Sequence, residues 1–400
     1  MSERSQALPA PEGEYVDTSR FGGLSILCAA VALVALLLGV VGAIVNPAQF
    51  GFSFLFAFAF YFTLCAGCFF WTIVHHAVDA EWSVVVRRQL ENIASLLVVL
   101  AIFFTTVLAL RHHLYEWMNV RPHHDESLDL KRAYLNWHFF LGRAVFVFVF
   151  FIIASQLLRR FSVRQDKDGN PRFTLLMRKI SFISLPLFAL CLTFGACDWL
   201  MSLNYKWFST MWGVYIFAGA AGSSMSLLVL IVTALRNAGY LQDVVTVEHY
   251  HIMGKWMLAF SVFWAYIGFS QYMLIWYANM PEETQYYLVR NTESWWWLSL
   301  LLVVGRFFGP FAILLLRSIK QHPRQLCMVA AWVLCMQMLD MYVIILPALH
   351  GTGVYLSIWD FVPLVSIGAT LAFIYLRILG KTSVFPVRDP RLIESINLKN

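Results

Sequence analysis

Residues 259–284, AFSVFWAYIGFSQYMLIWYANMPEET, begin with an apolar stretch that is long enough to cross a lipid bilayer as one helix. The stretch nevertheless carries Tyr266, Ser270 and Gln271 among its apolar residues. Polar side chains are costly in hydrocarbon, so a membrane helix that keeps several of them is expected to line a packed bundle or a wet cavity. The stretch therefore predicts a membrane helix and a candidate site on it.

The rest of the chain has the same character. Of 400 residues, 60% are hydrophobic and only 13% are charged, and the mean hydropathy is +0.67, which is too apolar for a soluble domain. The pattern predicts an all-α integral membrane protein with about ten transmembrane helices in residues 22–380, between an N-terminal tail, 1–21, and a C-terminal tail, 381–400. The expected spans are 24–45, 48–74, 90–110, 134–158, 176–200, 208–235, 252–279, 294–317, 324–347 and 355–378.

Basic residues are distributed unevenly between the two sides of these spans. Most of the 29 Lys and Arg residues fall in the two tails and in the loops after the second, fourth, sixth and eighth spans. The positive-inside rule then predicts a multi-pass protein with both termini in the cytoplasm. The net charge of +6 is accordingly a sign of membrane topology, and we expect lipid rather than nucleic acid as a partner.

Ionisable residues inside the spans are the candidate functional groups. A carboxylate at membrane depth must pair, face water or take up a proton, so such groups suit proton transfer. The proton-pathway candidates are His75, Asp79, His138, Asp198, Lys255, Tyr266, Ser270, Gln271, Asp340 and Asp360. Arg143 and Arg306 are candidates for tuning these charges. The competing interpretation is structural: Arg143 or Arg306 pairs with Asp198 or Asp340 and locks the bundle.

Motifs for bound redox groups are missing from the sequence. The chain has no Cys-x-x-Cys-His motif for covalent haem and no four-cysteine spacing for an iron–sulfur cluster. The histidines at 112, 113, 123 and 124 follow no compact metal-binding pattern. We therefore expect no metal site, no catalytic residue acting in this chain alone, and no cofactor held covalently by it.

Two runs of sequence resemble a known family. Residues 194–203, FGACDWLMSL, with 207–215, WFSTMWGVY, and residues 265–272, AYIGFSQY, with 275–284, IWYANMPEET, are similar to the ActF family. Its members are the second NrfD-like (quinone-binding) membrane subunit of alternative complex III, a bacterial quinol:cytochrome c oxidoreductase. The likeness extends over most of the chain from about 130 to 350.

The resemblance implies two four-helix bundles plus two extra helices in the bacterial cytoplasmic (inner) membrane. It implies as partners an NrfD-like sister subunit, an iron–sulfur/molybdopterin-like subunit and c-type cytochrome subunits, which would carry the iron–sulfur clusters and haem c of the respiratory electron transport chain. It leaves open whether this chain binds quinol or quinone, conducts protons across the membrane, or does both. The sequence departs from the family pattern at Arg306, where a histidine is expected. A permanently charged arginine cannot relay protons as a histidine can.

Two other classes of function fit the same residues. A secondary transporter would use proline-interrupted helices such as those with Pro186, Pro310 and Pro363, although no repeat in the two halves is evident. A structural scaffold would hold soluble redox subunits on the membrane, and its mark would be dry packing with every buried carboxylate paired to an arginine.

Overall fold

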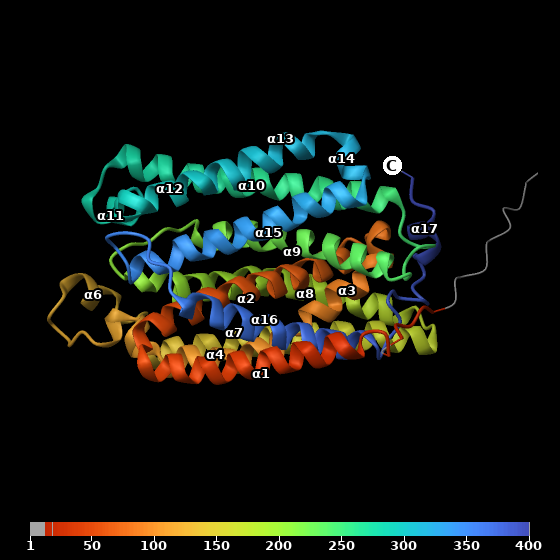
Figure 1. The fold of residues 1–400 in the computed structure, drawn as a ribbon, viewed down its shortest axis with the longest axis horizontal. Helices are drawn as coiled ribbons and strands as arrows, with labels where there is room; N and C mark the ends of the chain where they lie inside the picture. Colours follow the sequence, from red (N-terminus) through yellow and green to blue (C-terminus); the bar gives the residue numbers. More distant parts are fainter. Residues whose placement is uncertain (1–12, 18, 400) are drawn as a thin grey trace, which may run out of the picture.

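The fold was analysed in a computed structural model that describes residues 13–17 and 19–399. No β-strand occurs in this part of the chain, and ten helical segments there are long and apolar enough to cross a membrane. They lie side by side along the long axis of the molecule (Figure 1). The prediction of an all-α membrane protein with about ten spans is confirmed.

The ten spans are built from uninterrupted helices and from helices joined end to end. They are α1 (Gly22–Val45); α2 (Pro47–Ala77); η1 (Glu81–Ser83) with α3 (Val84–Ala94) and α4 (Leu97–Ala109); α7 (Trp137–Asp168); α8 (Arg172–Gly195) with η3 (Ala196–Leu200) and η4 (Met201–Asn204); α9 (Trp212–Asn237); α10 (Val247–Ala278); α12 (Glu293–Leu302) with η5 (Val303–Phe308) and α13 (Gly309–Leu315); α15 (Pro323–Ile345) with η6 (Leu346–Ala348); and α16 (Ile358–Leu379). The connections contain α5 (Arg111–Leu114), η2 (Glu116–Met118), α6 (Glu126–Lys131), α11 (Pro281–Arg290), α14 (Arg317–Gln321) and α17 (Leu392–Ile396).

The spans group into two bundles of four. In the first bundle α2, the α3–α4 span, α7 and α8 pack on one another, and in the second α9, α10, the α12–α13 span and α15 do so. The remaining two, α1 and α16, pair with each other, and α16 also packs on α2. This arrangement agrees with the expected two four-helix bundles plus two extra helices.

Helix α2 is the centre of the molecule. It packs against α8 of its own bundle, α9 of the second bundle and α16. Of the residues in its apolar 18-residue stretch, 94% are buried. Its phenylalanine-rich sequence fills the space between these neighbours with aromatic rings, as in the stacked pair Phe58 and Phe62. The first bundle, the second bundle and the α1–α16 pair are therefore all held to one helix.

The first and last described residues lie at the same end of the molecule, called here the tail end, while α6 and α11 lie at the opposite loop end (Figure 1). An even number of spans brings both ends to one side. The N-terminal and C-terminal segments also contact each other. Tyr15 forms an isolated β-bridge with Ser383, and the Val384 N–H donates to the Glu14 carbonyl at 2.9 Å. Residues 1–12 and 18 of the expected N-terminal tail lie outside the described residues.

The third span starts earlier than the hydropathy pattern predicts. Its helical run begins at Glu81, whereas the sequence places the start at 90. The reason is that Arg87, Arg88 and Glu91 lower the local hydropathy although all three are buried. Here polar residues belong to the interior of the helix bundle and not to a loop.

The contact between α2 and α9 depends on Gly67. A Cβ built on Gly67 would lie 2.2 Å from the Ala220 carbonyl oxygen, so only glycine permits this approach of the two helices. We predict that Gly67→Ala lowers the free energy of unfolding by about 1–3 kcal/mol through overpacking. Thermal unfolding in detergent measures the effect. Gly142→Ala is the control, because no heavy atom lies within 4 Å of a Cβ built there, and equal melting temperatures for the two variants would contradict the prediction.

Candidate functional site in the second bundle

A cavity of about 600 Å³ lies between α9, α10, α11, the α12–η5 segment and α15. Almost half of its walls are aromatic: Trp212, Tyr215, Trp264, Tyr266, Phe269, Tyr272, Tyr286, Tyr287, Trp296, Phe307 and Phe308. Tyr266, Phe269 and Phe308 are more than half exposed, so the cavity opens on the outer surface of the bundle. Its size is typical of pockets for small organic ligands.

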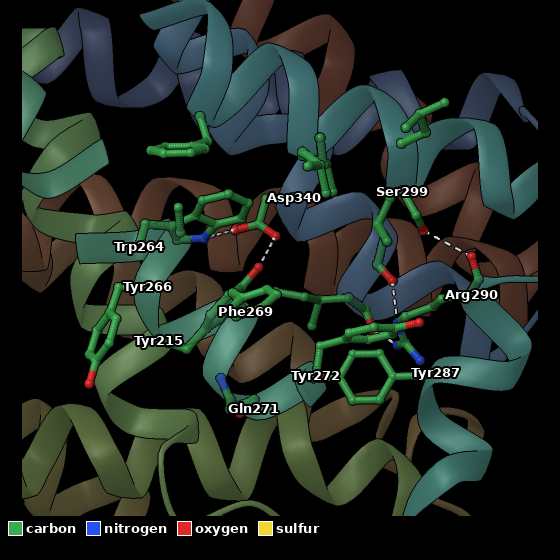
Figure 2. Close-up of a pocket in the computed structure, with 18 of the residues that line it drawn as sticks. Tyr215, Trp264, Tyr266, Phe269, Gln271, Tyr272, Tyr287, Arg290, Ser299 and Asp340 are labelled. Carbon is green, nitrogen blue, oxygen red and sulfur yellow. Dashed lines mark hydrogen bonds between the residues drawn. The ribbon is translucent and has the colours of Figure 1, made fainter. Parts of the chain in front are cut away.

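One side of the cavity is formed by Asp340, which is buried on α15. Its carboxylate accepts hydrogen bonds from the Tyr215 hydroxyl at 2.7 Å, the Trp264 Nε1–H at 3.2 Å and the Arg306 guanidinium at 2.7 Å. Figure 2 shows Asp340 directed between Trp264 and Tyr215. A charged carboxylate is thus held inside the membrane by one cation and two neutral donors.

Local backbone geometry brings Arg306 to this carboxylate. Arg306 lies in η5, a π-helical turn, and such turns are frequent at functional sites. The Gly305 carbonyl accepts a hydrogen bond from Trp332 Nε1–H at 2.6 Å. On the other side a Cβ at Gly219 would lie 2.8 Å from an Arg306 nitrogen, so glycine leaves room for the guanidinium. The sequence-based hypothesis that Arg306 pairs with Asp340 is confirmed by this geometry.

Arg290 lines the cavity away from Asp340, at the end of α11 (Figure 2). Its guanidinium donates to the backbone carbonyls of Tyr286, Val343 and Ile344 at 2.7–3.0 Å and lies 3.5 Å from the Tyr286 ring centroid. Burial raises the pKa of Tyr286 to about 12, so this phenol stays neutral beside the arginine. Sequence analysis missed Arg290, because it lies in a connection rather than in a span.

The predicted residues on α10 lie at different places around the cavity. Gln271 is buried in the cavity wall and accepts a hydrogen bond from the Ser209 hydroxyl at 2.7 Å. Tyr266 is 64% exposed, and its hydroxyl points away from Asp340 in Figure 2. Ser270 is half-buried and is not a lining residue. Of the two alternatives expected for α10, a packed bundle or a wet cavity, the structure shows a cavity, and Ser270 does not line it.

Asp198 and Arg143 form a second ion pair, in the first bundle. Arg143 on α7 donates from Nε and Nη2 to the two Asp198 oxygens, at 2.6 and 3.0 Å, and its guanidinium lies 3.8 Å from the Tyr134 ring centroid. Asp198 lies in η3, the other π-helical segment of the described residues. Neither member lines the cavity, so this pair matches the structural interpretation of the sequence.

Asp360 is bound by neutral groups. The carboxylate accepts hydrogen bonds from the Gln49 amide at 3.0 Å, the Ser53 hydroxyl at 2.5 Å and the Ser357 N–H at 2.9 Å. Gln49 also contacts His350 Nε2 at 2.6 Å. No ion pair of the described residues includes Asp360, so one buried carboxylate departs from the pattern expected of a dry scaffold.

A third set of buried charges lies at the tail end and was largely missed from the sequence. Arg87 contacts Glu91 at 3.5 Å and also pairs with Asp389, while Arg88 contacts Glu91 at 3.4 Å and also pairs with Asp166. The predicted His75 lies near this cluster, against the rings of Trp71 and Trp82, and neither of its ring nitrogens has a hydrogen-bond partner in the described structure.

The remaining candidates do not join these groups into one path. Asp79 follows α2 and contacts Arg391 at 3.3 Å, whereas His138 and Lys255 are exposed on α7 and α10. From Asp340, the hydrogen bonds of the described side chains run through Arg306 and Gln337 and end at Thr63. These hydrogen bonds do not connect Tyr266 or Gln271 with His75. The described residues also contain no group of three or more His, Cys, Asp or Glu placed to hold a metal ion.

The Arg87–Asp389 pair gives a testable pH dependence. Burial opposes ionisation of the Asp389 carboxyl, but Arg87 and the Arg391 N–H outweigh burial and leave its pKa below the ordinary value. A lowered folded-state pKa stabilises the fold above the unfolded pKa, and this contribution is lost as pH falls through the folded pKa. We predict that Asp389→Asn costs about 1.5–3 kcal/mol at neutral pH, because it removes a charged hydrogen-bond partner of Arg87 while Glu91 remains beside it.

The measurement is unfolding of wild type and Asp389→Asn between neutral pH and pH about 3. The difference should be constant near neutrality and should shrink at the acid end, where the wild-type carboxyl also takes up a proton. A difference that grows with acidity would contradict the assignment. Asp168→Asn serves as the control, because its pair with Arg164 is exposed and 3.3 Å long.

Comparison with known proteins assigns no family to the chain: no family model matches it, and no curated protein matches it.

Proposed function

We propose that the chain is an integral NrfD-like subunit of a quinol:cytochrome c oxidoreductase of the alternative complex III type, and that its cavity receives the quinol ring. The observation that carries this proposal is the aromatic cavity itself, which opens on the outer surface of the bundle and has Asp340 and Tyr215 in its wall. Flat rings pack on aromatic side chains, and a hydrophobic ligand that diffuses in the bilayer can reach a lateral opening.

Tyr215 connects this wall to proton transfer. Its hydroxyl donates to Asp340, and the same oxygen can accept a hydrogen bond from a ligand hydroxyl. A proton released by the ligand can therefore pass to Tyr215 as the tyrosine proton passes to Asp340. Arg306 stays charged throughout, so its role is to set the charge balance around Asp340 rather than to carry protons.

Electrons and protons would leave the cavity by different routes. The resemblance places haem c and iron–sulfur clusters in partner subunits, which would accept the electrons. Because the hydrogen bonds from Asp340 end at Thr63, we propose proton release near the loop end rather than conduction through this chain to the tail end. With the proposed cytoplasmic termini, that end faces the periplasm.

A structural scaffold is the second candidate, and the Arg143–Asp198 pair is the observation that favours it. A scaffold explains this bidentate, nearly buried pair without any chemistry. It gives no reason for an open cavity beside Asp340 or for Asp360 without a cation. The two functions can also coexist, with the first bundle as support and the second as the ligand site.

The first test is purification through a C-terminal tag in a mild detergent. Co-purification of c-type cytochromes, an iron–sulfur subunit and quinol:cytochrome c activity is the expected result. We predict that Tyr215→Phe lowers turnover of the purified complex by roughly 100-fold, because it removes the hydroxyl between ligand and Asp340 but keeps the ring and the ion pair. Tyr250→Phe is the matched control, since its hydroxyl contacts Thr233 instead of a carboxylate.

Equal turnover of the Tyr215→Phe and wild-type complexes would remove the cavity from the mechanism. A stable chain without haem-bearing partners would reject the respiratory proposal, and substrate uptake by that chain in liposomes would favour a transporter. Wild-type turnover in Tyr215→Phe and Asp340→Asn complexes that still assemble would favour the scaffold.

A further inference from the structure

The cavity has an unbalanced charge. Of the residues that line it, Asp340 and Arg290 are the charged ones, and Asp340 already pairs with Arg306 behind the wall. Asp340, Arg290 and Arg306 together therefore comprise two cations and one anion, which leaves a net positive charge. The tyrosines that line the Arg290 side do not restore balance, because burial raises the pKa of both Tyr286 and Tyr287 and keeps them neutral.

Arg290 is the cation left without an anion. In the described chain its guanidinium contacts three backbone carbonyls and the face of Tyr286, and no ion pair of the described residues includes it. Asp340 is the carboxylate that acts on it electrostatically, from beyond ion-pair distance. Carbonyl dipoles and an aromatic face attract a guanidinium but leave its net charge in place.

A net positive charge at the edge of hydrocarbon is costly unless an anion or water compensates it. Three of the five guanidinium N–H groups are accounted for by the three carbonyls, so donors remain for a further acceptor. The Ser299 hydroxyl nearby is itself occupied, because it donates to the Arg290 carbonyl at 2.9 Å. The missing anion is therefore expected on the ligand.

We propose that the cavity prefers a ring ligand with an ionised hydroxyl, whose anionic oxygen is bound by Arg290. This inference rests on the proposed function and adds the charge of the ligand to it. In this arrangement the ligand oxygen near Tyr215 gives up its proton through Tyr215 to Asp340. A second ligand oxygen, which has lost its proton, is stabilised by Arg290. Arg290 is thus a ligand-positioning residue that lowers the pKa of a bound hydroxyl.

Two probes of nearly equal size test the proposal: the acidic hydroxynaphthoquinone lawsone, which is an anion at neutral pH, and its uncharged methyl ether. Equilibrium dialysis of the purified protein or complex against detergent micelles without protein measures both dissociation constants. We predict that wild type binds lawsone at least about 10-fold more tightly than the ether, a ratio that corresponds to about 1.4 kcal/mol. The ratio should fall toward one as pH drops through the pKa of lawsone itself.

Substitutions then assign the preference to one residue. In Arg290→Gln the ratio should fall to about one while the ether still binds, whereas Arg290→Lys keeps the charge and should retain most of the preference. The wild-type ratio and its pH dependence need no substitution, so they decide the question even if Arg290→Gln does not fold. Oleate is added as a competitor, because a fatty acid is an anion without a ring.

Each outcome has a separate meaning. If neither naphthoquinone binds wild type, the proposed quinol site fails and this inference falls with it. If both bind equally, the charge preference is wrong while the quinol site stands. A preference that survives in Arg290→Gln overturns the role of Arg290, and displacement of lawsone by oleate at equal concentration overturns the selection for a ring.

Discussion

The cost of placing charge in hydrocarbon controls how this bundle is assembled. Three buried carboxylates of the spans are each met by a group that arrives from another helix: Arg143 from α7 for Asp198, Arg306 from η5 for Asp340, and Gln49 from α2 for Asp360. These contacts fix which helices neighbour each other and at what depth, which apolar packing against lipid does only weakly. The polar contacts therefore specify the arrangement, and the aromatic core around α2 fills it.

The two π-helical segments occur where this constraint is strongest. One holds Asp198 and the other holds Arg306, and each supplies one member of an arginine–carboxylate pair. A π-helical turn changes the direction in which the following side chains point, so a residue can be turned toward a partner without moving the whole helix. The pairs differ in their surroundings, since Asp340 of the Arg306 pair lines the cavity and neither member of the Arg143 pair does. That difference separates a group that supports the fold from one that is available to a ligand.

Sequence reasoning reached the helices and part of the site. Long apolar runs such as that of α1 make the spans evident, and the two arginines within spans could be expected to meet the nearby carboxylates. The α11 side of the cavity could not be predicted, because α11 folds back so that Arg290 reaches the carbonyls of α15. The tail-end cluster was missed because Arg87 and Glu91 resemble loop residues in a hydropathy profile, and because Asp389 lies 302 positions from its partner Arg87. Contacts over such separations leave no local pattern.

The central position of α2 also has a consequence for biosynthesis. The ribosome makes this helix before α8, α9, α15 and α16, which cover it and follow later in the chain. Until they arrive, Gln49 and Ser53 have no carboxylate to bind, and the glycine face at Gly67 has no helix against it. The nascent protein must therefore keep this aromatic helix in lipid or beside an insertion factor while eight further spans are synthesised. The interior of the molecule can close only after Asp389, near the end of the chain, has left the ribosome.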